Sequence, residues 1–158
     1  MISNKNTLKH LVSATSGEFY TLDEICTVDN KKQFIGKIGY AVQSDNNIIY
    51  SPCSGTVIGI SEKQDLFTIY SHDGLIIRIN VGLENYYTPE NILSYVHLYD
   101  EVIIGQIIAI YEKKYILPSS KKLITPVYVE NAELIKTYSL TPTGRMEGGK
   151  SISLTYKI

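Results

Sequence analysis

The chain has 158 residues, of which 44% are hydrophobic and 20% charged, a size and composition typical of one domain with a single core. Its 15 Lys and Arg residues nearly balance 16 Asp and Glu, so it offers no clustered positive charge for nucleic acid or an anionic membrane. No apolar run approaches the roughly 20 residues that span a bilayer, and the polar start lacks the apolar stretch of a secretory signal. These features predict a cytoplasmic protein.

Residues that carry chemistry are scarce. His10, His72 and His97 are the only histidines, and phosphate-binding glycine loops, HExxH, GxSxG and paired CxxC motifs are all absent from the sequence. Cys26 and Cys53 have no Cys or His neighbour at metal-ligand spacing, so we interpret both as reduced structural thiols. The sequence therefore predicts neither a metal site nor a cofactor.

The N-terminal segment differs in composition from the rest of the chain. Residues 1–15 mix Lys, Asn, Ser and Thr with few apolar residues, and we predict an N-terminal tail there. Residues 16–158 are predicted to form one domain.

Short runs rich in Ile, Val, Tyr and Thr, separated by turn-forming residues, fill the remainder of the chain. The predicted strands lie at residues 17–22, 40–44, 47–52, 55–61, 66–71, 74–82, 102–111, 125–131 and 151–158. Only short helical turns are expected, at Asn131–Lys136 and from Thr88. This pattern predicts an all-β antiparallel sandwich or barrel. No exact internal repeat is visible, but residues 48–60 and 102–111 share a strand, glycine turn and strand pattern that predicts two similar hairpins packed together.

Seven short motifs in order resemble one family, the glucose-type enzyme IIA domain of the bacterial phosphoenolpyruvate-dependent sugar phosphotransferase system. The motifs are Gly17-Glu18, Gly39–Gln43, Ser51–Val57, Ser71–Leu75, Val81–Glu84, Val102–Gln106 and Thr125–Asn131. The likeness extends from about Gly17 to Ile158. It implies a β-sandwich of the duplicated hybrid kind, in agreement with the strand pattern.

The resemblance also implies an activity and partners. Members of this family relay a phosphoryl group from the phosphocarrier protein HPr to a sugar-specific IIB domain through one histidine, beside which a second histidine lies. An imidazole suits the relay because it is a neutral nucleophile near neutral pH, and its second nitrogen can be held by a neighbour.

This chain departs from the family at both histidine positions. An ungapped alignment from Gly74 places Asn80 at the accepting histidine, and an amide nitrogen delocalised into its carbonyl has no basic lone pair. The second histidine falls on Asp65 and the threonine before it on Lys63. A carboxylate at position 65 would repel phosphate. The resemblance therefore leaves no catalytic residue intact.

The partner-binding surface implied by the family is predicted to include Arg78, Asn80, Asp65, Phe67, Val81 and Glu84. Its apolar wall is expected to comprise Ile76, Val81, Phe67 and Leu66. Arg78 stands where the family carries an apolar residue, and we expect it to be an unpaired charge that opposes the old partner and selects an acidic one.

Two functions follow as hypotheses. The first is a binding or regulatory protein of sugar transport or metabolism that carries no phosphoryl group, either peripheral to a transporter or bound to HPr, a IIB domain or another target. The second is an active phosphocarrier transferase that uses an unrecognised acceptor. His72 lies eight residues from Asn80, about 26 Å along an extended strand, His97 is expected to be half-buried or at a strand edge, and His10 lies in the tail.

Two other proteins with related folds are excluded by their motifs. Zinc endopeptidases of the lysostaphin-like kind need HxxxD and HxH ligands, and biotinyl carriers need a modified lysine between methionines. The sequence contains neither pattern.

Overall fold

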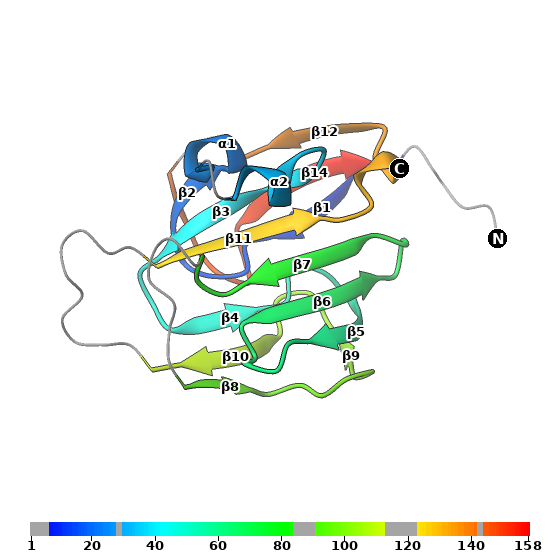
Figure 1. Ribbon diagram of the computed structural model, residues 1–158. Coiled ribbons are helices and arrows are strands. Elements are labelled where there is room, and N and C mark those ends of the chain that lie inside the picture. The colour runs from blue at the N-terminus through cyan, green and yellow to red at the C-terminus, as the bar shows by residue number, and fades with distance from the viewer. Residues whose placement is uncertain (1–6, 28–29, 84–90, 113–122, 142–143) are drawn as a thin grey trace.

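Antiparallel β-strands make up most of the computed structural model, which describes residues 7–27, 30–83, 91–112, 123–141 and 144–158 (Figure 1). The strands are β1 (Lys9–Val12), β2 (Gly17–Thr21), β3 (Ile38–Ser44), β4 (Ile48–Tyr50), β5 (Gly55–Ile60), β6 (Leu66–Ser71), β7 (Ile76–Asn80), β8 (Ile92–Ser94), β9 (Glu101–Val102), β10 (Ile107–Tyr111), β11 (Ile124–Val129), β12 (Thr137–Leu140), β13 (Arg145–Met146) and β14 (Ile152–Lys157). Two short helices, α1 (Leu22–Ile25) and α2 (Lys31–Phe34), and a 3₁₀ helix (Ala132–Leu134) complete the described elements. The all-β sandwich prediction is confirmed.

The sheets have the symmetry of a duplicated motif. An eight-stranded sheet has the order β13-β2-β3-β11-β7-β6-β5-β9, and the other two sheets have the orders β1-β14-β12 and β4-β10-β8. Strands at equal distances from the two edges of the large sheet are equivalent: β13 matches β9, β2 matches β5, and β3 matches β6. The small sheets match each other in the same way, and they lie at opposite ends of the molecule in Figure 1.

The backbone hydrogen bonds of residue 13 recur at residue 51, which lies 38 residues further along the chain. Ser13 N donates to Ser151 O at 2.8 Å and Ser51 N donates to Gln106 O at 2.7 Å. Ser13 O accepts from Gly149 N and Ser51 O from Gly105 N, both at 2.8 Å. Residues 11–18 and 49–56 are therefore a structural repeat. The repeat is hard to see in the sequence because the two segments share only serines and a glycine.

Gly17 and Gly55 hold the same place in the two halves, and each lies against a neighbouring strand. A Cβ atom on Gly17 would lie 1.8 Å from Gln43 O, and one on Gly55 would lie 2.2 Å from Tyr70 O. Both distances are far shorter than any van der Waals contact. Glycine is therefore required at both positions by the close approach of two backbones.

The N-terminal segment is a strand from Lys9, and the predicted tail of residues 1–15 is wrong over its described part. β1 pairs with β14, with Leu11 opposite Leu154. Leu11 is 1% and Val12 8% exposed, so both side chains belong to the core. The composition of this segment is polar because a single buried face needs only two or three apolar residues.

Two further local predictions are corrected. Residues 48–60 and 102–111 do not fold as hairpins but pair with each other, β4 with β10 and β5 with β9. Asn131 does not cap an α-helix: its side chain donates to Gly74 O at 3.0 Å and accepts from Ile76 N at 2.8 Å, and a 3₁₀ helix follows. The helical turn predicted from Thr88 lies outside the described residues.

A hydrophobic core lies between the large sheet and the two small sheets, with fully buried side chains from both halves such as Tyr40, Phe67, Ile79, Ile108 and Leu154. A second cluster lies on the other side of the large sheet. There α1 and α2 bury Leu22, Ile25 and Phe34 against Ala41 and Tyr128. Thr21 and Glu24 form a capping box at the start of α1, which supports this short helix. These helices, absent from the sequence-based prediction, cover the outer face of β3 and β11.

Candidate partner-binding face

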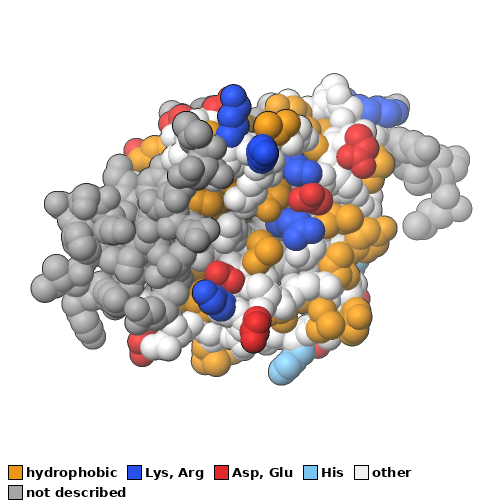
Figure 2. Space-filling view, viewed as in Figure 1, with side chains coloured by type: hydrophobic (Ala, Val, Ile, Leu, Met, Phe, Trp, Pro, Cys, Tyr) orange, Lys and Arg blue, Asp and Glu red, His pale blue; other side chains and the backbone are white. Residues whose placement is uncertain are grey.

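The outer face of β6 and β7 carries the side chains of Leu66, Thr68, Tyr70, Ile76, Arg78 and Asn80, and we call it the β6–β7 face. Residues alternate along both strands, and in β7 the two buried positions are Ile77 and Ile79. Within the part of the chain that the structure describes, no helix covers this face. Figure 2 shows charged and hydrophobic side chains mixed on this side of the molecule.

Asn80 and Asp65 lie at the same end of the β6–β7 face. Leu66 is paired with Asn80 across the two strands, and Val81 N donates to Asp65 O at 2.7 Å. Both Asn80 and Asp65 are half-buried. Lys63 lies in the preceding turn with an exposed side chain. The structure therefore brings together the two residues predicted at the family's histidine positions.

Ser61, which sequence reasoning missed, fixes the turn before β6. Its hydroxyl donates to Asp65 Oδ1 at 2.7 Å and accepts from Asp65 N at 3.1 Å and Leu66 N at 2.9 Å. A serine four residues before an aspartate in a turn is the available signal for such a local hydrogen bond. The Asp65 carboxylate is thus tied to its own turn.

Arg78 is paired, which corrects the expectation of an unpaired charge. Its Nε lies 3.2 Å from Glu130 Oε2, and Lys37 Nζ lies 2.8 Å from Glu130 Oε1. The Arg78 Nε–H has no aligned acceptor, so its contact with Glu130 is an ion pair and not a directed hydrogen bond. The side chains of Arg78 and Glu130 are 34% and 35% exposed. The Glu130 carboxylate therefore pairs with both Lys37 and Arg78. Because Arg78 already has this partner, it does not by itself indicate that the protein binds an acidic partner.

Two residues of the predicted surface face the core. Phe67 and Val81 are both fully buried, so neither contributes to an apolar wall on the outside. Phe67 is paired with Ile79 and shares its inward direction. The apolar side chains that do lie on the outside are Leu66, Tyr70 and Ile76. Glu84 lies outside the described residues.

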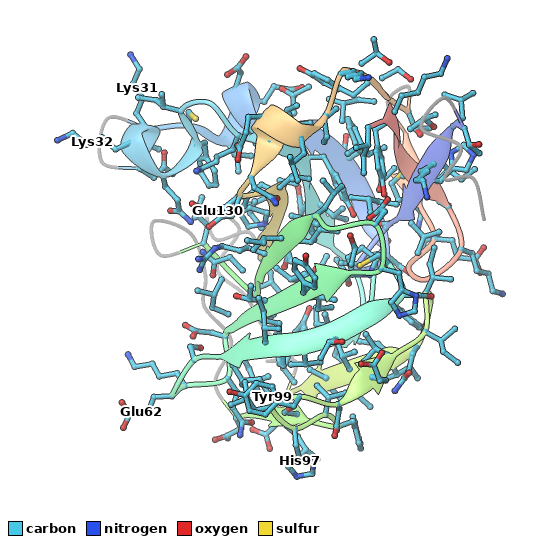
Figure 3. All side chains as sticks on the ribbon, turned by 90° about the vertical axis from the view of Figure 1, so that its right-hand side faces the viewer. Lys31, Lys32, Glu62, His97, Tyr99 and Glu130 are labelled. Atoms are coloured by element: carbon cyan, nitrogen blue, oxygen red, sulfur yellow. The ribbon has the colours of Figure 1, made fainter. Side chains whose placement is uncertain are left out.

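The three histidines are far from a shared site. His97 is 92% exposed and lies between β8 and β9, which corrects its expected position as a half-buried or strand-edge residue. It points away from the body near Tyr99, at the end of the molecule opposite Lys31 and Lys32 (Figure 3). His10 Nδ1 lies 2.9 Å from Thr155 Oγ1. His72 Nε2 lies 3.5 Å from Glu101 Oε2, in the turn between β6 and β7, at the end of the β6–β7 face away from Asn80.

Both cysteines are free thiols, and burial raises the pKa of the Cys53 thiol to about 12. Among the described residues, no three His, Cys, Asp or Glu side chains gather closely enough to hold a metal ion. The described helices are also too short to cross a bilayer.

Sequence comparison connects this fold to a known system. The family model for the phosphoenolpyruvate-dependent sugar phosphotransferase system, EIIA 1, matches residues 9–135. A glucose-specific EIIA component from Buchnera aphidicola is 25% identical over 141 residues, which cover 89% of this chain and 86% of the relative. An N-acetylglucosamine-specific EIICBA component from Klebsiella pneumoniae is 21% identical, and the match covers 95% of this chain but only 23% of that longer protein.

The fold comparison agrees. The glucose permease IIA from Mycoplasma capricolum superimposes with a TM-score of 0.78 at 20% identity, covering 97% of this chain and 99% of the other. The two proteins therefore share the duplicated antiparallel sandwich fold. The chain belongs to the EIIA 1 family of the phosphoenolpyruvate-dependent sugar phosphotransferase system.

Proposed function

We propose that this protein is a phosphotransferase-system EIIA domain that carries no phosphoryl group and acts by binding other proteins in sugar transport or its regulation. The observation that carries the proposal is the pair Asn80 and Asp65 at one end of the β6–β7 face. The proposal places the protein in the cytoplasm, where Cys26 and Cys53 would stay reduced.

Neither residue of this pair suits phosphoryl transfer. The Asn80 nitrogen is an amide donor without a basic lone pair, so it cannot attack phosphorus as an imidazole does. A carboxylate such as that of Asp65 is a weaker nucleophile than an imidazole, and its charge opposes the approach of an anionic phosphoryl group. Its hydrogen bond with Ser61 also holds it in its own turn instead of toward Asn80.

The β6–β7 face supports a protein-binding role because it combines apolar and charged groups on rigid strands. Tyr70 is 47% exposed, and Leu66 and Ile76 are half-buried. Arg78 and Glu130 add one ion pair near its centre. Apolar anchors beside a small number of charges are typical of protein interfaces. We propose HPr or a IIB domain as partners.

A second candidate function, an active phosphocarrier, is favoured by one observation. Thr56 Oγ1 donates to Glu101 Oε1 at 2.5 Å, and the other oxygen of Glu101 faces His72 Nε2. A carboxylate on one ring nitrogen orients an imidazole and leaves Nδ1 available as a nucleophile. Against this, a second carboxylate, Asp73, follows His72 in the chain. We therefore rank this function second.

Binding to the β6–β7 face is tested by NMR titration of the full chain with HPr and with a IIB domain. We expect amide shifts confined to β6 and β7, and a loss of at least about tenfold in affinity for Ile76→Asp, because an unpaired carboxylate would be desolvated at the interface. Ile35→Asp is the matched control, since Ile35 is an exposed isoleucine away from this face. Shifts elsewhere, or equal losses for both variants, would contradict the proposed face.

A further inference from the structure

A cleft of about 310 Å³ opens at the junction of the two halves, where the equivalent glycine turns at Gly105 and Gly149 meet. It lies apart from the β6–β7 face and has no part in the proposed function. Its lining consists of Ser16, Asn46, Tyr50, Gly105, Arg145, Glu147, Gly148, Gly149 and Lys150. The volume corresponds to about ten water molecules of the liquid, which is room for a small organic molecule.

The aromatic wall of this cleft is held rigidly. Cβ atoms on Gly148 and Gly149 would lie 2.7 Å and 2.8 Å from carbon atoms of the Tyr50 ring, so the ring lies directly on the glycine turn. Gly148 N donates to Ser16 Oγ at 2.9 Å and Gly149 N donates to Ser13 O at 2.8 Å, which fix the turn from the other side. A preformed wall reduces the entropy that a ligand would lose on binding.

Three side chains of the cleft have hydrogen-bond donors to spare. Within the described chain, the Tyr50 hydroxyl and Asn46 Nδ2 have no acceptor, although Asn46 Oδ1 accepts from Ile48 N at 3.3 Å and from Thr15 Oγ1 at 3.2 Å. Lys150 Nζ has one carboxylate partner, Glu147 at 3.4 Å, and two further protons to donate. Free donors on three side chains favour a ligand that presents acceptor oxygens.

Both cationic side chains of the cleft already have a carboxylate partner. Arg145 is paired with Asp45 and Lys150 with Glu147, so the charges balance, and it is the spare hydrogen-bond donors that favour an oxyanion. Arg145 donates Nε and Nη2 to Asp45 at 2.8 Å and 3.1 Å, which fixes its guanidinium and leaves Nη1 unused by that pair. Lysine and arginine together are the usual partners of phosphate and carboxylate groups. Glu147 adds an acceptor suited to a ligand hydroxyl.

We propose that this cleft binds a hydroxylated small molecule with one oxyanion group, either a phosphate ester or a carboxylate. The oxyanion would lie at Lys150, Asn46 Nδ2 and the Tyr50 hydroxyl, and a hydroxyl of the ligand would donate to Glu147. Binding at this site does not involve Asn80 or Asp65, so it is independent of the proposed protein-binding function.

The test is NMR titration of the full chain, followed at the amides of Gly105, Gly148 and Gly149. The probes are glucose 6-phosphate and gluconate, with glucose and inorganic phosphate as partial ligands that each lack one feature. We expect saturable shifts with one or both oxyanion sugars, and binding at least about tenfold weaker for each partial ligand, as hydrogen bonds to charged groups predict. Whichever oxyanion sugar binds more tightly identifies the phosphate or the carboxylate as the preferred group.

Two variants and a control keep the test independent of folding. Asn46→Asp keeps the Oδ1 acceptor but replaces the free donor by a negative oxygen, and Lys150→Gln removes one exposed charge. Both should weaken binding at least about tenfold, whereas Lys32→Gln on α2 should not. The proposal is overturned if neither oxyanion sugar gives a saturable shift, if a partial ligand binds equally well, or if the two variants bind as the unmodified chain does.

Discussion

The two halves of the molecule have equivalent strands but different outer faces. In the first half, the connection between β2 and β3 contains α1 and α2, which bury Phe34 and Leu22 against the large sheet. In the second half, the equivalent connection between β5 and β6 is residues 61–65, a turn fixed by Ser61. Among the described residues, helices therefore cover the large sheet on one side of its symmetry axis and not on the other.

This difference shows where binding can occur in a duplicated fold. The covered half is apolar, with Phe34 and Tyr128 in an edge-to-face contact at 5.5 Å between ring centroids. The open half carries the ion pair of Arg78 and Glu130 among half-buried apolar residues. A surface of mixed character can stay exposed in the free protein and still bind a partner.

The largest expected effect is on the covered half. Phe34→Ala removes a ring that is 6% exposed and should lower the free energy of unfolding by about 4 kcal/mol, as is usual for a buried phenylalanine. Leu66→Ala on the open half should cost less than about 1 kcal/mol because this side chain is only half-buried. Urea denaturation measures both values, and equal losses would mean that the two outer faces do not differ as described.

A smaller effect is expected at the equivalent glycines. Gly17→Ala and Gly55→Ala should each lower the free energy of unfolding by about 3 kcal/mol, because each new methyl group would overlap a backbone carbonyl. Gly36→Ala is a control with open space around the Cβ position, although its φ of 72° is unfavourable for alanine. If only one of the first two variants is destabilised in thermal unfolding, the two positions are not equivalent.

The ion-pair cluster of the open half should contribute less. Glu130→Gln leaves Lys37 and Arg78 without their shared carboxylate and should cost about 1 kcal/mol, since all three groups are partly exposed. The loss should shrink at high salt, which screens the charges that are paired in the unmodified protein. Glu133→Gln, at an exposed position, serves as the control and should leave stability unchanged within error.

The smallest effect is a local pKa. The Thr56 hydroxyl, followed by His72, lowers the pKa of the Glu101 carboxyl, so Thr56→Val should raise that pKa toward its ordinary value. A lowered pKa in the folded state stabilises the protein above the unfolded value, and this contribution is lost as the pH falls through the folded value. An NMR titration of the Glu101 side chain measures the change, and an unaltered pKa would contradict the role of Thr56.

Much of the fold could be predicted from local sequence because strands and turns alternate regularly from Gly17 onward. The strand β1 could not, since its partner β14 lies at the other end of the chain and its own apolar residues are few. The pairing of β4 with β10 and of β5 with β9 was likewise invisible, because local patterns do not specify which strand lies beside which.

Some residues of the candidate site could be predicted from the sequence, and others could not. Asn80, Asp65 and Arg78 could be placed from the family motif and the alternation of β7. Phe67 is predicted on the outer face but lies in the core. It is paired with Ile79, which is next to Asn80 in β7 and therefore faces inward. Glu130 could not be predicted as the partner of Arg78, since that contact depends on the register of β11 against β7.

The central claim, that Asn80 and Asp65 leave the domain without a phosphoryl acceptor, is tested most directly by incubating the full chain with phosphoenolpyruvate, enzyme I and HPr. An EIIA domain with both family histidines serves as the positive control in the same reaction. The account predicts no phosphorylated form of this chain by intact mass when the control is fully converted. A phosphorylated form that is labile to acid and stable to base would mark phosphohistidine and contradict it, and loss of that form in His72→Gln would identify the acceptor.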